Sequence, residues 1–404
     1  MSDSWLVVLT SEPDTDHIVA ALAHSVKRGQ KIHFEVRGRA TRVMRERLTV
    51  LSRLGSISIT ENRFPPLESR IWEKLLRIRH NRALLRRWIK QQQFSLIVHE
   101  WWDGIAGLLP GPTTDSRDWL FLDFSLQLQV AARDLGVPVV ALPHGHALLS
   151  DEVAFPGNHA LEIATQNFGR LPFSNRDSFS AYVVAHETDR RYLIRRTEMS
   201  GDNVVVWGSA RFSPEWVQTL YDNTIDAQVF SPDLRRKTLF FLPKWNSRIH
   251  RQETIDLLRR LADHPEIELV VAEHPRRGAS RLSQTEMDEL TGARVLAPGH
   301  DSVSLIKACE CVVEISSSIC IDAVLTGMRL VMPRYLQAEA AETRLDDAVS
   351  ITRTFDAEST IAAILDDSVV PSVDEFFLKE IATQKHPDTL KRYDDGLRAI
   401  AAAR

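Results

Sequence analysis

The sequence has no apolar run long enough to cross a lipid bilayer, which takes about 18 to 20 uninterrupted apolar residues. Its first residues join a short apolar run to several acidic residues, a pattern typical of a first β-strand and not of a secretory signal peptide. The formal net charge of −4 gives no support for binding to nucleic acid. We therefore expect a cytoplasmic protein with no nucleic-acid partner.

Cysteine is scarce, and its spacing excludes the common zinc sites. The three cysteines, Cys309, Cys311 and Cys320, have neither a Cys-x-x-Cys spacing nor a nearby histidine. His144 and His146 are one residue apart, but no third ligand accompanies them. We therefore expect buried thiols and no metal site.

Two nucleotide-binding motifs are also missing. The chain has no G-x-x-x-x-G-K-[ST] segment and no G-x-G-x-x-G after its first predicted strand. These absences argue against P-loop kinases and against oxidoreductases that bind a dinucleotide. We expect no cofactor.

Short apolar runs that are rich in β-branched residues alternate with helix-like segments along all 404 residues. Thirteen runs are predicted to be strands: 5–9, 31–36, 56–60, 94–100, 137–145, 181–186, 203–208, 238–244, 267–275, 293–298, 311–317, 329–333 and 349–354. Their continuous hydrophobicity favours parallel strands that helices cover on both faces. The pattern predicts an α/β protein of two Rossmann-like domains, residues 1–210 and 211–404, whose parallel sheets face an interdomain cleft.

Polar residues follow several predicted strands, at the sheet edge where open parallel sheets bind ligands. The first half has HEWWDG (99–104) and LPHGHALLSDE (142–152), and the second has PKWNSR (243–248), EHPRRG (273–278) and SSSIC (316–320). These segments come from both halves of the chain, whose sheets are predicted to face one cleft. We therefore expect them to serve one site.

Three hydroxyl side chains, Ser316, Ser317 and Ser318, stand between a predicted strand and a predicted helix. Hydroxyls and backbone N–H groups at such a turn suit a phosphate. The alternative is simple capping of the helix, which one serine performs in either case.

His274 and Pro275 follow an apolar strand, with Arg276 and Arg277 next. Histidine at this place can stabilise a leaving phosphate, and arginine can bind phosphate or a carboxylate through two hydrogen bonds. The alternative is an exposed turn. Another His-Pro pair, at residues 264–265, precedes a strand and therefore belongs at the opposite edge of the sheet.

Two carboxylates, Glu100 and Asp103, stand beside Trp101 and Trp102 after a predicted buried strand. A partly desolvated carboxylate can act as a general base, whereas the alternative is an aspartate that caps a helix beside buried tryptophans. Two further groups of candidates lie at predicted strand ends. His144 and Gly145 are candidates for binding the acceptor, since glycine lets a ligand approach the main chain. Lys244, Asn246 and Arg248 are candidates for binding an anion.

Three short motifs occur in the order Asp103-Gly104, His274-Pro275 and Ser316-Ser317. Together they resemble the signatures of bacterial sialyltransferases, GT-B glycosyltransferases that use CMP-activated sugars, with Trp102 in place of the first acidic residue. The wider setting is similar to that of bacterial Kdo transferases of capsule and O-antigen synthesis. More distantly it resembles CDP-glycerol glycerophosphotransferases, which share a histidine-glycine pair.

This resemblance implies a metal-independent transfer of an acidic sugar, Kdo ahead of sialic acid, from its CMP donor to a growing glycan or lipid-linked glycan. It implies that His274, Ser316 and Ser317 face the CMP phosphate. Asp103 would activate the acceptor hydroxyl, with Glu100 as the alternative. Arg276 or Lys244 would meet the sugar carboxylate.

A basic segment, residues 70–90, interleaves leucine and tryptophan with eight lysines and arginines. Such a segment can lie on anionic lipid as a peripheral contact with the inner membrane. The alternative is a helix that packs its apolar stripe on the sheet and leaves its basic residues in water.

Three function classes stay open. The main hypothesis is the CMP-sugar-dependent glycosyltransferase, and the second is transfer of a polyol phosphate from CDP-glycerol. The third is a non-catalytic subunit that binds a nucleotide or a glycan, which Trp102 favours. We set aside a sugar-nucleotide epimerase, which also has two Rossmann-like domains, because it needs more catalytic carboxylates than the sequence lets us place.

Overall fold

The structure is a computed structural model. It describes residues 4–37, 39–61, 71–100, 124–143, 145, 179–197, 200–243, 245, 249–273, 281–297, 299–315, 317–337, 348–368, 373–384 and 388–403. Within these residues, each of the thirteen predicted strands coincides with a strand of the structure.

The chain forms two compact units. The first contains Met1–His146, Pro156–Ser213 and Lys385–Arg404, and the second contains Ala147–Phe155 and Pro214–Gln384. The change of unit at Ser213 lies close to the division predicted after residue 210. The end of the chain differs from the prediction, because helix α13 (Thr389–Ala402) belongs to the first unit and not to the second.

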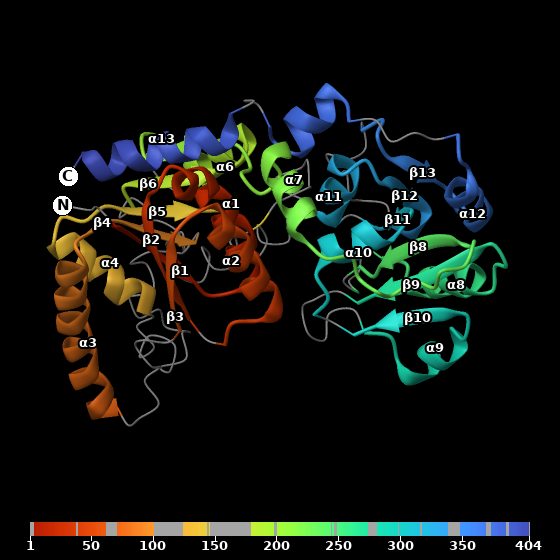
Figure 1. The fold of residues 1–404 in the computed structure, drawn as a ribbon, viewed down its shortest axis with the longest axis horizontal. Helices are drawn as coiled ribbons and strands as arrows, with labels where there is room; N and C mark the ends of the chain where they lie inside the picture. Colours follow the sequence, from red (N-terminus) through yellow and green to blue (C-terminus); the bar gives the residue numbers. More distant parts are fainter. Residues whose placement is uncertain are drawn as a thin grey trace. The chain divides into compact units, whose positions relative to one another are not determined.

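The first unit is built on a seven-stranded sheet in the order β3-β2-β1-β4-β5-β6-β7, and every pairing in it is parallel. Its strands are β1 (Ser4–Leu9), β2 (Lys31–Val36), β3 (Ile57–Glu61), β4 (Phe94–Glu100), β5 (Val139–Leu142), β6 (Ala181–Val184) and β7 (Val204–Val206). The described helices besides α13 are α1 (Glu12–Lys27), α2 (Arg42–Leu54), α3 (Ile71–Gln92), α4 (Phe124–Asp134) and α6 (Glu187–Thr197). Helix α1 packs against both α2 and α13, whereas α3 packs against α4 (Figure 1).

The second unit has a six-stranded parallel sheet in the order β10-β9-β8-β11-β12-β13. Its strands are β8 (Arg236–Phe241), β9 (Ile267–Ala272), β10 (Ala293–Leu296), β11 (Cys311–Val313), β12 (Arg329–Pro333) and β13 (Thr352–Thr354). Its described helices are α7 (Pro214–Asn223), α8 (Arg251–Ala262), α9 (Gln284–Glu289), α10 (Ser302–Ala308), α11 (Ile319–Leu325) and α12 (Ala357–Leu365), with the short turns η3 (Arg334–Leu336) and η4 (Phe377–Ile381).

The central strands are buried throughout, which explains their continuous apolar sequences. All six residues of β9 are buried, as are the last five of β1. Strands of a parallel sheet that helices cover on both faces expose neither face to water. The prediction of two parallel α/β sheets is confirmed.

Helix α13 is held on the first unit by a buried carboxylate and by an aromatic pair. Asp394, which is fully buried, accepts hydrogen bonds from Ser25 (2.7 Å), Arg28 (2.7 Å) and Arg398 (2.8 Å). The Tyr393 hydroxyl donates to the carbonyl of Gly208 at 2.8 Å. The local pattern of α13 predicts a helix but does not say which sheet it covers, so these contacts explain the difference from the predicted domain boundary.

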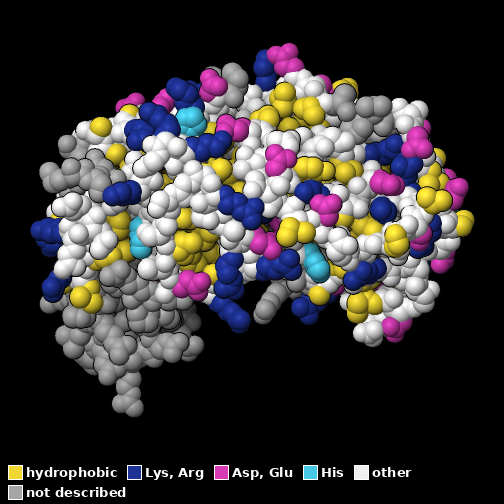
Figure 2. Space-filling model, viewed as in Figure 1, with side chains coloured by type: hydrophobic (Ala, Val, Ile, Leu, Met, Phe, Trp, Pro, Cys, Tyr) yellow, Lys and Arg dark blue, Asp and Glu magenta, His cyan; other side chains and the backbone are white. Residues whose placement is uncertain are grey.

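Helix α3 shows which interpretation of the basic segment holds for its described side chains. Leu85, Trp88 and Ile89 lie in the core of the first unit, whereas Arg82 and Arg86 are exposed and pair with Asp134 at 2.5 and 3.6 Å. The apolar stripe therefore packs on the protein. No helix in the described part of the chain is long and apolar enough to span a bilayer. Over the described part of the face in Figure 2, basic and acidic side chains are interspersed.

Candidate functional site

In each sheet, successive strands are added outward in one direction and then, from one point on, in the opposite direction. In the first unit the strands run from β1 outward to β3 and then from β4 to β7, so this switch point lies between β1 and β4. In the second unit it lies between β8 and β11 for the same reason. Ligands of open α/β sheets bind beyond the carboxyl ends of the strands at such points.

Glu100 lies at the switch point of the first unit, as the last residue of β4. Its Oε1 lies 2.6 Å from the hydroxyl oxygen of Thr10, which directly follows β1. The same hydroxyl lies 2.5 Å from Oδ2 of Asp14, in the first turn of α1. One threonine therefore joins two carboxyl groups that stand 86 residues apart in the sequence.

Both carboxyl groups lie within hydrogen-bond distance of the Thr10 hydroxyl, which has a single hydrogen and donates to one of them at a time. Asp14 also accepts from the Thr10 N–H (3.1 Å) and from the Ser11 hydroxyl (2.6 Å). Asp14 is therefore the more strongly hydrogen-bonded of the two carboxyl groups.

The pKa of Asp14 is consistent with these hydrogen bonds. Burial raises it, but the hydrogen bonds from Glu100, Ser11 and Thr10 outweigh burial and hold it below the ordinary value. Sequence reasoning identified Glu100 but missed its partners Thr10 and Asp14. The cue was the TSEPD segment directly after the first strand.

A second charged cluster fixes the end of β7 on the first unit. Asp16 binds Arg47 at 2.6 Å and also binds Arg211, and both arginines are buried. Burial raises the pKa of Asp16, but the two guanidinium groups outweigh it and lower this pKa strongly. Because both arginines are inaccessible, the cluster has a structural role.

The serine turn after β11 uses two of its backbone N–H groups within the protein. The backbone N–H of Ser317 donates to Oε2 of Glu314 at 2.5 Å, and Glu314 is fully buried. The N–H of Ile319 donates to the Ser317 hydroxyl oxygen at 3.2 Å. Ser317 therefore performs the capping that we expected of one serine, while the hydroxyl of Ser318 caps nothing in α11. The turn offers hydroxyl hydrogens to a ligand, since these two N–H groups are already used.

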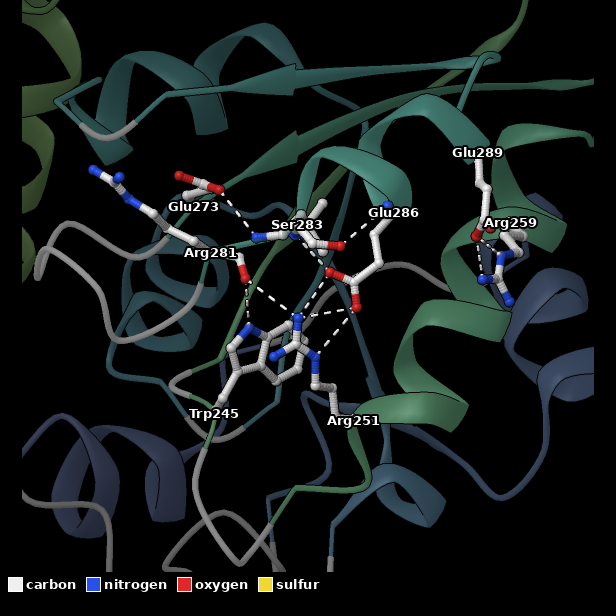
Figure 3. Close-up of polar contacts among 9 residues, drawn as sticks. Trp245, Arg251, Arg259, Glu273, Arg281, Ser283, Glu286 and Glu289 are labelled. Carbon is white, nitrogen blue, oxygen red and sulfur yellow. Dashed lines mark hydrogen bonds and ion pairs between the residues drawn. The ribbon is translucent and has the colours of Figure 1, made fainter.

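The ends of the segment that carries His274 are fixed at the same edge of the sheet (Figure 3). Glu273 directly follows β9, and its Oε1 accepts from the N–H of Leu282 at 3.3 Å. Trp245, which follows β8, donates its indole N–H to the carbonyl of Arg281 at 3.2 Å. Glu273 and Arg281, the described residues on either side of this segment, therefore lie beside the carboxyl ends of β8 and β9.

Several predicted site residues lie outside the described residues: Asp103, His144, Lys244, Asn246, His274, Pro275, Arg276 and Ser316. Their roles stay predictions. Among the described ones, Gly145 follows β5, and no described atom lies within 4 Å of the position that a Cβ would take there. The main chain at Gly145 is therefore open on that side.

No cluster of three or more metal-binding side chains occurs among the residues that the structure describes. The three cysteines are buried and unpaired, as predicted. Burial raises the pKa of all three thiols, that of Cys311 to about 12. They are therefore protonated and unreactive at neutral pH.

No family model matches this sequence, and no curated protein is similar to it in sequence. Solved structures do resemble it in fold. A UDP-GlcNAc 2-epimerase from Neisseria meningitidis, bound to UDP-GlcNAc, has a TM-score of 0.56 and 12% identity over 99% of this chain and 100% of that one. A putative UDP-N-acetylglucosamine 2-epimerase from Listeria monocytogenes has a TM-score of 0.55 and 10% identity over 100% and 97%. S. aureus MnaA, solved with UDP, has a TM-score of 0.52 and 14% identity over 96% and 94%. At these identities the likeness concerns the fold, and this chain has the two Rossmann-like α/β domains of GT-B proteins.

Proposed function

We propose that this protein is a glycosyltransferase that uses a nucleotide-activated sugar. The observation that carries the proposal is the strand order of the second unit, in which β9 and β11 both neighbour β8. These two strands precede His274-Pro275 and Ser316-Ser317. Since neighbouring strands are about 4.8 Å apart, the two motifs start about 10 Å apart along one edge of the sheet. One phosphate group can meet side chains from both.

In the proposed reaction the bond between the anomeric carbon and the donor phosphate breaks, and the nucleotide leaves with the electron pair. The acceptor hydroxyl oxygen bonds to the anomeric carbon, and its proton passes to a carboxylate. The leaving phosphate gains negative charge, so hydrogen-bond donors at the β9 and β11 ends favour the transition state.

We assign the proton acceptor to Glu100, and Asp103 is the alternative. Glu100 ends a central strand at the switch point, and Thr10 and Asp14 hold it by hydrogen bonds. Glu100 must be ionised to accept the proton of the acceptor hydroxyl.

We propose a CMP-activated acidic sugar, Kdo in the first place, as the donor, on the strength of the His-Pro and Ser-Ser motifs. The acceptor would be a surface glycan or a lipid-linked glycan of lipopolysaccharide, O-antigen or capsule. A UDP-activated sugar is the alternative, since the structural neighbours in complex hold UDP or UDP-GlcNAc. Transfer from CDP-glycerol and a purely binding role are two further alternatives. The donor screen described below distinguishes them.

Sugar-nucleotide epimerisation is a second candidate function. The observation that favours it is the fold likeness to two proteins described as UDP-GlcNAc 2-epimerases, at TM-scores of 0.56 and 0.55. The pair of Asp14 and Glu100 supplies one more carboxyl group than the sequence alone let us place. This removes part of the reason for setting an epimerase aside.

A contact with the inner membrane also belongs to the proposal, in a narrower form than the sequence allowed. Leu85 and Trp88 are in the core, so they are not available to insert into lipid. The charged residues that face solvent at the described end of α3 are all basic: Arg82, Arg86, Arg87 and Lys90, with Leu84 exposed beside them. The contact would therefore rest on charge, worth about 1 kcal/mol per basic residue at an anionic surface.

A donor screen tests the proposal. The purified protein is incubated with CMP-Kdo, CMP-sialic acid, CDP-glycerol and UDP-GlcNAc, and mass spectrometry follows release of the nucleotide or polyol phosphate. Release of CMP that the Glu100→Gln variant fails to support is the expected result. A change in sugar configuration, seen by NMR without nucleotide release, would favour the epimerase. Nucleotide binding without turnover of any donor would contradict catalysis and favour the binding subunit.

A further inference from the structure

Arg281 is an exposed arginine whose main chain is fixed from two sides. Its carbonyl accepts from the indole N–H of Trp245 at 3.2 Å and from the guanidinium of Arg251 at 3.5 Å. The next residue, Leu282, donates its N–H to Glu273. These contacts hold the main chain of Arg281 in place, whereas its side chain is exposed to solvent.

The guanidinium of Arg281 has no acidic partner in the described part of the chain, unlike its neighbours. Arg251 binds Glu286 at 2.8 Å, and Arg259 pairs with Glu289. In Figure 3 the side chain of Arg281 extends away from the cluster of Trp245, Arg251 and Glu286. An arginine stays charged at every physiological pH, so this side chain presents an uncompensated cation to solvent.

This cation lies at the ligand-binding edge of the second sheet. Trp245 follows β8 and donates to the carbonyl of Arg281, whereas Glu273 follows β9 and accepts from the N–H of the next residue, Leu282. Arg281 therefore lies beside the carboxyl ends of these two strands. Strand β8 forms one side of the switch point, and β11, which precedes the turn with Ser317, forms the other. The position is therefore next to the place where an α/β sheet binds its ligand.

The local charges call for a cation there if the ligand is an anion. The described acidic residue that directly follows β9 is Glu273, and its carboxylate would repel a phosphate. A guanidinium offsets this repulsion and donates two parallel hydrogen bonds to a phosphate or a carboxylate. Because the main chain is already ordered, less freedom is lost when the side chain binds.

We propose that Arg281 binds an oxyanion of the sugar-nucleotide donor, either its phosphate or a carboxylate on its sugar. This inference rests on the proposed function and names a donor contact that the motifs do not include. The residue is a binding determinant, so its removal weakens donor affinity. Loss of a charged hydrogen bond to an oxyanion corresponds to about a ten- to one-hundred-fold weaker affinity.

Isothermal titration calorimetry tests the inference with cytidine, CMP and CMP-Kdo on the full-length protein, or with uridine, UMP and UDP-GlcNAc if these are the nucleotides that bind. The variants are Arg281→Ala and Arg281→Lys. The matched control is Arg260→Ala, which removes an exposed arginine from α8 whose partner is Glu358. Thermal melting should show the Arg281 variants folded as well as the wild type, because this guanidinium makes no hydrogen bond or ion pair with a described residue.

If the oxyanion is the phosphate, Arg281→Ala lowers the affinity for CMP and leaves that for cytidine unchanged. If it is the sugar carboxylate, only the affinity for intact CMP-Kdo falls. Arg281→Lys should recover part of the loss, and Arg260→Ala should match the wild type. Unchanged affinities for every nucleotide in Arg281→Ala, with normal binding by the wild type, overturn the inference and leave the proposed function standing. If the wild type binds no nucleotide, the proposed function fails and the inference with it.

Discussion

Substitution of Gly396 by alanine tests how α13 sits on the first unit. A Cβ on Gly396 would lie 2.3 Å from Cζ2 and 2.6 Å from Cη2 of Trp207, well inside van der Waals contact. Trp207 is 8% exposed and packs edge to face on Tyr393, with ring centroids 5.2 Å apart. The indole therefore has little room to move away.

Two opposing effects set the expected magnitude. Alanine favours a helix interior over glycine by about 1 kcal/mol. Overpacking a buried site costs about 1 to 3 kcal/mol, and the short distance to Trp207 places this site toward the upper end. We expect Gly396→Ala to destabilise the first unit by about 1 to 2 kcal/mol. For a unit of about 200 residues this lowers Tm by about 2 to 8 °C.

In the Trp207→Phe background, the effect of Gly396→Ala on stability should change sign. Phenylalanine has a single ring and lacks the outer, fused ring of the indole, which carries Cζ2 and Cη2. The higher helix propensity of alanine then dominates. We expect Gly396→Ala to raise stability by up to about 1 kcal/mol in the Trp207→Phe background. Differential scanning calorimetry of the four proteins measures the coupling. Stabilisation by Gly396→Ala in the wild-type background would refute the packing of α13 on Trp207.

Two further predictions concern the first unit. The turnover rate should rise with pH as the proposed base Glu100 becomes ionised, and Asp14→Asn should move this rise to lower pH because it removes a negative charge close to Glu100; a profile that Asp14→Asn does not shift would contradict a coupling between the two carboxyl groups. Reversal of charge at Arg82, Arg86 and Arg87 should abolish co-sedimentation with vesicles that contain anionic lipid, and wild-type binding that the reversal leaves unchanged would end the proposed membrane contact.

The fold was largely predictable because its signals are local. A strand that helices cover on both faces must be apolar throughout, so β1 and β9 stand out in the sequence as uninterrupted apolar runs. The place of α13 was not predictable, since the pattern of a helix shows its buried face but not which sheet covers it. Asp394 binds Ser25, 369 residues away, and no periodicity carries that information.

The candidate site was predictable in its position and only partly in its chemistry. The strand ends at Glu100 and Ser317 were recognised from polar residues that follow apolar runs. The contact of Glu100 with Thr10 and Asp14 depends on β1 and β4 being neighbours, which is a property of strand order. The use of the Ser317 N–H by Glu314 was missed because a buried acid within EISSS reads as part of the strand.

Hydrogen–deuterium exchange with and without a saturating nucleotide tests most directly where the nucleotide binds. We predict slower exchange in the segments that follow β8, β9 and β11, namely residues 242–245, 281–283 and 317–320. The opposite edge of the same sheet, including residues 263–266 before β9, should exchange at an unchanged rate. Protection confined to that opposite edge or to the first unit would contradict the placement of the nucleotide at the β8 and β11 switch point.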